Sequence, residues 1–475
     1  MLFIKKFEMK KILLFYPPLY FSSGLPYSID TSVPPLGLLY LASYINKYSK
    51  KINAKVIDIA SEKISLEHII SMIKKENPFA VGISSMTPQL QGAVELAKTI
   101  RVGFGKKIKI FLGGPHISAD PDFVRRHDGV FDYGITGEAE ITFFESLEKL
   151  IAGKKIPKIQ AGKIVINLDE IPFLDRSLIK RNRYSQHESM MYSRGCPYHC
   201  YYCSRPSISK LIRYRSAKNM VDGIKLAYKD CQGVIDFQDD TFTLDKNKVL
   251  EFCQEVKKSN LKLNWRCQSR IDLVDDEVLR TMAEAGCSLI HFGIESGNEH
   301  IRQEIVKKGS FSNKKIFEVF KLCKKHKIKI AAYFMIGHPG ETWKELEETK
   351  KLIFRLKPDI LGLSIPTPFP GSQLYEIAVK NGIISEKTID AFANKELGEG
   401  YSGVYPVFVP QDVTKEELYA FMKNINRKFY LNFHTFLVHL KEDITSLERL
   451  KKDFSDLLSL IMKGVSARKP YINKK

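Results

Sequence analysis

Cysteine is scarce in this sequence. The 475 residues include eight cysteines, and none lies before Cys196 or after Cys323. This number is too small for a disulfide-rich scaffold, and no disulfide can link the two ends of the chain. We therefore expect a protein of a reducing, cytoplasmic compartment.

Long apolar runs are also missing. No stretch approaches the roughly 18 consecutive apolar residues of a membrane-spanning helix. The apolar run at residues 12–16 ends at Pro17-Pro18, and it is shorter than the roughly 7–15 residues of a signal-peptide core. The sequence indicates neither a membrane span nor export.

Positive charge is abundant but is not concentrated in one segment. Lys and Arg number 74 against 54 Asp and Glu, which gives a formal net charge of +20. The densest basic run, residues 321–329, alternates with apolar residues, as the solvated end of a helix does. We therefore expect no nucleic-acid partner. The protein is also expected to be a soluble monomer.

Short β-rich runs alternate with helical patterns in residues 10–150. The β-rich runs cover residues 11–16, 55–59, 80–84 and 108–112. Such alternation predicts a parallel sheet with helices on both faces. Residues 10–150 are therefore expected to form an α/β, Rossmann-like, doubly wound domain that binds a ligand at the carboxyl ends of its strands.

The remaining chain divides into three parts. Residues 151–184 lose the helical periodicity and are interpreted as a linker. Six strand and helix repeats in residues 185–385 predict a partial (β/α)6 barrel of the TIM type, with its reactive edge at the carboxyl ends of the strands. The first strand is expected near residues 189–193, and one of the helices near residues 246–258. Residues 386–475 are expected to form a mostly helical C-terminal cap.

Three cysteines are clustered directly after the first predicted barrel strand. Cys196, Cys200 and Cys203 follow a C-x3-C-x2-C spacing. Three thiolates at this spacing can bind three irons of a four-iron four-sulfur cluster and leave the fourth iron open. The alternatives are a zinc site, which needs a fourth ligand such as His199, and unligated buried thiols.

This motif resembles the signature of the radical S-adenosylmethionine (SAM) superfamily, with the aromatic Tyr202 before the last cysteine. Similar segments follow the later strands, at residues 237–242, 267–270, 293–297 and 334–342. The resemblance implies that the open iron binds SAM and that Cys196, Cys200 and Cys203 are catalytic. It also implies an electron donor such as flavodoxin or ferredoxin.

Polar and small residues at these strand ends are expected to bind SAM. Arg270 can pair with the carboxylate of SAM, and Asp239, Asp240 or Glu295 can accept hydrogen bonds from its ammonium group or ribose. Gly337 would let the backbone approach the adenine. The complete set of predicted SAM contacts is Tyr202, Asp239, Asp240, Gln268, Arg270, Glu295 and Gly337. Alternatively, the acidic residues only cap strand ends.

Four segments of the N-terminal domain resemble the cobalamin-binding domain that is fused to one large branch of the superfamily. These segments are residues 33–37, 84–87, 113–116 and 137–140. The resemblance implies cobalamin contacts at Pro35, Gly37, Ser84, Ser85, Thr87, Gly113, Gly114, Pro115, His116, Gly137 and Glu138. A nucleotide-binding or ligand-free Rossmann-like domain is the alternative, although no G-x-G-x-x-G motif opens a helix here.

One motif of many cobalamin proteins is absent. In Asp-x-His-x-x-Gly the histidine ligates cobalt from below, but here Asp58 is followed by Ile59, Ala60 and Ser61. Because Ala60 cannot ligate a metal, we expect no protein histidine below cobalt. His116 is the other histidine at a strand end. It follows residues 113–115, where the cobalamin tail is expected, and a role as the cobalt ligand is the less favoured alternative.

The resemblance implies a cobalamin-dependent radical SAM enzyme with a small-molecule substrate. We expect a methyltransferase that moves a methyl group from SAM through methylcobalamin to an unactivated carbon, after the deoxyadenosyl radical has abstracted a hydrogen. Alternatives are an oxidative or ring-rearranging enzyme similar to the anaerobic porphyrin cyclases, a transfer-RNA methylthiolating enzyme, and a non-catalytic iron–sulfur or cobalamin sensor. The methylthiolating enzymes carry an additional N-terminal cysteine set, which this sequence lacks.

Overall fold

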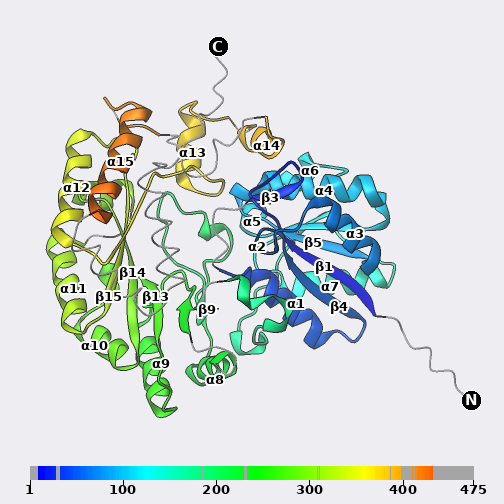
Figure 1. The fold of residues 1–475 in the computed structure, drawn as a ribbon, viewed down its shortest axis with the longest axis horizontal. Coiled ribbons are helices and arrows are strands. Elements are labelled where there is room, and N and C mark those ends of the chain that lie inside the picture. The colour runs from blue at the N-terminus through cyan, green and yellow to red at the C-terminus, as the bar shows by residue number, and fades with distance from the viewer. Residues whose placement is uncertain are drawn as a thin grey trace, which may run out of the picture.

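The computed structural model contains two α/β domains side by side (Figure 1). It describes residues 9–27, 33–184, 187–228, 233–307, 309, 311–385, 387–396, 408–410 and 412–431. None of the helices formed by these residues is long and apolar enough to cross a membrane.

A six-stranded parallel sheet forms the centre of the N-terminal domain. Its strand order is β4 (Ile52–Asp58), β1 (Lys10–Tyr16), β5 (Ala80–Ser84), β6 (Lys109–Gly113), β7 (Tyr133–Thr136) and β8 (Ile159–Ala161). The first five strands follow the flavodoxin-like order, in which the crossover between β4 and β5 creates a ligand crevice at the strand ends. The predicted doubly wound fold is confirmed.

Helices cover both faces of this sheet because its strands are apolar on both sides. In β1, Leu13 and Phe15 pack against α3 (Leu66–Glu76) and α4 (Leu90–Phe104), whereas Ile12 and Leu14 pack against α1 (Leu36–Tyr48) and α7 (Glu140–Ile151). The shorter elements are β2 (Tyr20–Ser22), β3 (Leu25–Tyr27), α2 (Ile59–Glu62), α5 (Pro115–Ala119) and α6 (Phe123–Arg126). The edge strand β8 lies within the segment interpreted as a linker.

The second domain is an open barrel of six parallel strands. Their order is β16 (Ile360–Ser364), β15 (Lys329–Met335), β14 (Cys287–Glu295), β13 (Trp265–Ser269), β12 (Val234–Phe237) and β9 (His187–Met190). Its helices are α8 (Ala217–Tyr228), α9 (Lys246–Lys258), α10 (Asp276–Glu284), α11 (Asn313–Lys325) and α12 (Trp343–Leu356). Aromatic residues such as Phe237, Phe252 and Trp265 form the core between strands and helices. The predicted partial barrel is confirmed.

The C-terminal helices contact both domains. Helix α15 (Lys415–Tyr430) covers the free edge of the barrel sheet, where the Tyr430 hydroxyl donates a hydrogen bond to the Leu361 carbonyl at 2.6 Å. Along the chain, α13 (Gln373–Lys380) and α14 (Thr388–Ala393) come after the last barrel strand, β16, and before α15. The predicted helical tail is thus observed over α15, and residues 432–475 lie outside the described part of the chain.

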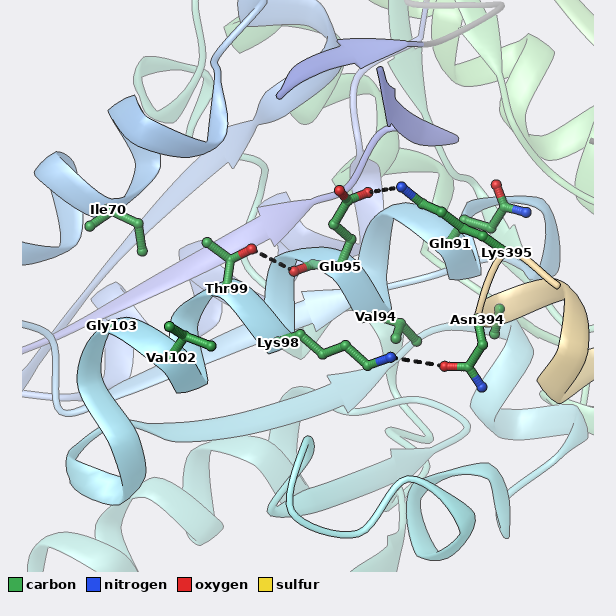
Figure 2. Close-up of a pocket in the computed structure, with 11 residues that line it drawn as sticks. Ile70, Gln91, Val94, Glu95, Lys98, Thr99, Val102, Gly103, Asn394 and Lys395 are labelled. Atoms are coloured by element: carbon green, nitrogen blue, oxygen red, sulfur yellow. Dashed lines mark hydrogen bonds and ion pairs between the residues drawn. The ribbon is translucent and has the colours of Figure 1, made fainter. Parts of the chain in front are cut away.

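Helix α14 packs on α4 of the N-terminal domain. Phe392 joins the core of that domain, and its carbonyl accepts a hydrogen bond from the Gln91 side chain at 3.0 Å. Figure 2 shows Lys98 reaching Asn394 beside a surface groove of about 560 Å³. None of the predicted cofactor residues lines this groove, so we interpret it as a gap at the packed edge of α14.

We predict that α14 contributes to the stability of the N-terminal domain. Phe392→Ala removes a buried ring and should cost about 3–5 kcal/mol, whereas Ile383→Ala, at a position that is 42% exposed, should stay within about 0.5 kcal/mol of the parent. Urea unfolding of both variants measures the difference. Equal midpoints would contradict the packing described for α14.

Candidate active site

The three clustered cysteines lie on the loop between two short strands, β10 (Ser193–Arg194) and β11 (Arg213–Tyr214). Cys200 is buried, and Cys196 and Cys203 are partly exposed. The Cys203 sulfur accepts a hydrogen bond from the Arg205 backbone N–H at 3.4 Å, and burial raises the pKa of the Cys203 thiol. A bound iron would offset this penalty because it stabilises the thiolate.

The arrangement of these thiols fits a multinuclear cluster. Among the described residues, no group of three or more His, Cys, Asp or Glu side chains converges to hold a single metal ion. Cluster thiolates bind different irons and therefore do not need to converge on one point. Cys196, Cys200 and Cys203 supply three cysteine sulfurs from one short loop, which is the donor set that a four-iron four-sulfur cluster with one open iron requires.

Asp239 fixes the chain that leads into this loop. Its buried carboxylate accepts hydrogen bonds from the backbone N–H groups of Tyr192, at 3.0 Å, and Ser193. Burial raises the pKa of Asp239 to about 7. From the sequence, Asp239 is expected either to contact SAM or to cap a strand end. The observed hydrogen bonds to backbone N–H groups are those of a cap.

Arg270 reaches the cysteine loop from the end of β13. Its buried guanidinium lies 3.7 Å from the centre of the Tyr198 ring, a position typical of a cation–π contact. It also binds Asp272, with an Nη2–Oδ2 distance of 2.8 Å. Arg270 is therefore held in a fixed orientation beside the loop.

Glu295 contacts the loop from the end of β14. Its buried carboxylate accepts a hydrogen bond from the Tyr202 hydroxyl at 2.8 Å. The backbone of Glu295 has a φ of 71°, which is rare for a residue with a side chain, and the pairing with β15 shifts register just before it. This irregularity turns Glu295 out of the strand alternation at the position where it meets Tyr202.

Three further predicted SAM contacts lie at the same edge. Asp240 pairs with Arg205 at 2.9 Å, and Gln268 is exposed on the face of β13 opposite the core. Gly337 has a φ of 91°, but a Cβ there would approach Leu418 of α15 to 2.7 Å. The space beside the Cα of Gly337 is thus occupied by the C-terminal helix.

One contact of the loop was not assigned from the sequence. The Tyr201 hydroxyl and His338 Nδ1 are 2.7 Å apart, and both side chains are buried. Glu341, also buried, accepts hydrogen bonds from the backbone N–H groups of Gly337 and His338, and burial raises its pKa to about 7. In the sequence, the turn-forming run Gly337–Glu341 after β15 could have indicated this contact. The hydrogen bond between His338 and Tyr201 joins this strand end to the cysteine loop.

The predicted cobalamin residues lie at the carboxyl edge of the N-terminal sheet. Gly114 has a φ of 97°, and a Cβ there would come within 2.8 Å of Ser84 and Ser85. A Cβ on Gly37 would meet no atom within 4 Å, and one on Gly113 would meet only a carbonyl at 3.8 Å. The space beside Gly37 and Gly113 is therefore open, and such glycine backbone suits the close approach of a broad corrin ring. Three other predicted cobalamin contacts border the same strand ends: Pro35, Pro115 and Gly137.

His116 is enclosed by protein. Its Nδ1 lies 3.1 Å from the Thr87 hydroxyl oxygen, its ring meets the Phe123 ring edge-on, and burial lowers its pKa to about 4. At the end of β4, the Asp58 carboxylate accepts hydrogen bonds from the Ser61 backbone N–H and the Tyr184 hydroxyl. Both residues thus have local partners within the domain.

Glu138 lies at the boundary between the two domains. Its carboxylate accepts hydrogen bonds from Arg194 at 3.0 Å and from Arg213, and Arg194 also binds Glu140 at 2.7 Å. Arg194 is two residues before Cys196. The edge of the N-terminal sheet is therefore joined by ion pairs to the start of the cysteine loop.

Two family models match this chain. The model of the radical SAM superfamily matches residues 190–353, and the model of the B12 binding domain matches residues 27–146. An uncharacterized methyltransferase of Pyrococcus horikoshii is 30% identical over 89% of this chain and 93% of its own length. The anaerobic magnesium-protoporphyrin IX monomethyl ester cyclase of Rubrivivax gelatinosus is 25% identical over 96% of this chain and 83% of its own length.

A solved structure shares the two-domain fold. The radical SAM methyltransferase TsrM of Kitasatospora setae superposes with a TM-score of 0.65 at 17% sequence identity, over 79% of this chain and 77% of TsrM. The cofactors predicted from the sequence, a four-iron four-sulfur cluster, SAM and cobalamin, are those of the matched superfamily and domain. The chain belongs to the radical SAM enzymes that carry a cobalamin-binding domain.

Proposed function

We propose that this enzyme is a C-methyltransferase that moves a methyl group from SAM, through cobalamin, to an unactivated carbon of a small molecule. The observation that carries the proposal is the contact between the two predicted cofactor edges, made by Arg194 with Glu138 and Glu140. A methyl carrier and a radical source must share one substrate cavity, and this contact brings their domains together. The Pyrococcus relative is also named a methyltransferase.

When bound, the cluster and SAM supply a hydrogen-abstracting radical, and cobalamin supplies a methyl carrier. In this proposal Cys196, Cys200 and Cys203 hold the cluster. The partial exposure of Cys196 and Cys203 would leave this side of the loop accessible to an electron donor such as flavodoxin or ferredoxin.

We assign the binding of SAM to residues around the loop. Arg270 would pair with its carboxylate, since the guanidinium is fixed beside the loop by Tyr198 and Asp272. Glu295, oriented by Tyr202, would accept hydrogen bonds from SAM. Gln268 and Asp240 would complete the polar edge. Together these side chains orient SAM and exclude water.

We assign the binding of cobalamin to the open backbone of the N-terminal sheet edge, with Gly37 and Gly113 facing the corrin. His116 would not ligate the metal, because its side chain is fully enclosed by protein and packs against the Phe123 ring. The carboxylate of Asp58 is bound by Tyr184 and Ser61.

An oxidative cyclisation is the second candidate, favoured by the similarity to the Rubrivivax cyclase along 96% of this chain. The product distinguishes the two reactions. Methylation adds one methyl group from labelled SAM, whereas cyclisation removes hydrogen and leaves the label out of the product.

Of the predictions that follow from the proposed function, the first concerns the cluster ligands. Anaerobic reconstitution should give about four irons per chain, and Cys200→Ala should lose the cluster and the reductive cleavage of SAM. Cys323→Ala is the matched control, because this buried thiol belongs to the barrel core. Iron and sulfide analysis checks both variants. Retained SAM cleavage by Cys200→Ala would exclude the assignment.

The second prediction concerns SAM. Arg270→Gln and Glu295→Gln should each weaken SAM binding at normal iron content, because a charged hydrogen bond contributes about 1.5–3 kcal/mol, or roughly tenfold to a hundredfold in affinity. Arg280→Gln, which changes an exposed arginine on α10, should bind SAM normally. Equilibrium dialysis measures all three, and unchanged affinity in both test variants would leave only structural roles for Arg270 and Glu295.

The third prediction concerns the lower face of cobalamin. The loaded enzyme should show a base-off absorption spectrum, and paramagnetic resonance of its cob(II)alamin form should lack nitrogen splitting. His116→Asn, which retains a partner for Thr87, should leave both spectra unchanged. A nitrogen-split signal that disappears in this variant would make His116 the cobalt ligand.

A further inference from the structure

Arg194 lies where a small displacement would be passed on to the cysteine loop. It ends β10, which pairs with β11 through Ser193–Tyr214 and Arg194–Arg213. The next residue, Gly195, has a φ of 95°, and a Cβ there would come within 2.2 Å of the Leu211 carbonyl. The backbone at Gly195 therefore lies close against the chain at Leu211. This packing leaves little room for Arg194 to move independently of Cys196.

Arg194 and Arg213 form a buried ion-pair cluster with Glu138 and Glu140. The four side chains are 12%, 5%, 7% and 6% exposed, respectively. Although burial alone would raise the pKa of Glu140, the Arg194 guanidinium holds it below its usual value. Two positive and two negative charges balance, so the cluster can remain ionised without solvent.

The geometry of this cluster is specific. Arg194 binds two carboxylates through different nitrogens, Nη1 to Glu138 and Nη2 to Glu140. Its guanidinium also lies 5.0 Å from the centre of the Tyr40 ring on α1. A planar guanidinium held at three points fixes orientation as well as distance, which a flexible ammonium group does less well.

The buried ion-pair cluster connects two segments to which the proposed function assigns cofactors: the end of β7, assigned to cobalamin, and the loop of Cys196, assigned to the iron–sulfur cluster. Glu138 follows Gly137 at the end of β7, and Arg194 precedes the loop of Cys196 by two residues. Both carboxylate oxygens of Glu138 accept hydrogen bonds from arginines, Arg194 and Arg213, at the domain interface. The cobalamin contact that the sequence assigns to Glu138 stays a prediction.

We propose that Arg194 is a positioning residue that sets the separation and orientation of the iron–sulfur cluster relative to cobalamin. This proposal rests on the proposed function, in which the end of β7 contacts cobalamin and the loop of Cys196 holds the iron–sulfur cluster. Other ion pairs lie away from both segments, such as that of Lys395, which follows α14, with Glu95 of α4. Displacements of about 1 Å can cost roughly a hundredfold in rate at a reacting centre.

The test measures the separation of the two cofactors by pulsed paramagnetic resonance, from the dipolar coupling between the reduced cluster and cob(II)alamin. Arg194→Gln should broaden or shift the distance distribution, whereas iron content and corrinoid affinity remain those of the parent. Arg194→Lys, which keeps the charge, should restore it in part. Lys395→Gln removes the ion pair between the C-terminal segment and α4 and should leave the distribution unchanged.

A second variant keeps the test decisive if Arg194→Gln fails to fold. Arg194→Gln combined with Glu140→Gln leaves no unpaired charge at that contact, while Arg213 still binds Glu138. A distribution identical to that of the parent in this double variant would overturn the proposal, as would equal broadening by Lys395→Gln. Because the readout requires no substrate turnover, the positioning role and the methyltransferase reaction can fail separately.

Discussion

The cysteine loop is held by side chains that the barrel strands provide, and the candidate site depends on these contacts. Asp239 binds the chain before the loop, Arg270 covers Tyr198, Glu295 binds Tyr202, and His338 binds Tyr201. Asp239, Arg270 and His338 follow β12, β13 and β15, and Glu295 is the last residue of β14. A parallel barrel aligns its strand ends at one edge, so residues far apart in sequence meet around three thiols.

Burial gives these contacts their strength and also their cost. Asp239 and Glu341 lose water, which raises the pKa of each to about 7, and the backbone N–H groups that they bind compensate in part. At the domain boundary, Arg194, Arg213, Glu138 and Glu140 offset the same penalty by pairing opposite charges. In both places buried polar groups define a geometry that apolar packing alone would leave less specific.

The fold could be predicted from the sequence because its periodicity is strong, and its irregular parts could not. The helix expected at residues 246–258 is observed at Lys246–Lys258. The strand expected at residues 189–193 is divided into β9 and β10, because Asp239 binds the N–H groups of Tyr192 and Ser193. Motif spacing located the cysteine loop and its neighbours. Glu140 is 54 residues from Arg194, and no local pattern reveals such a pair. The domain boundaries and the roles of the site residues stay predictions.

The central claim is that SAM and cobalamin serve one methyl transfer across the domain interface. The most direct measurement supplies the reconstituted enzyme with SAM labelled in its methyl group and with reduced cobalamin, and then separates the corrinoid from the protein. The account predicts that the label is recovered in the corrinoid. A corrinoid that binds stoichiometrically but stays unlabelled, while the enzyme still cleaves SAM reductively, would contradict it.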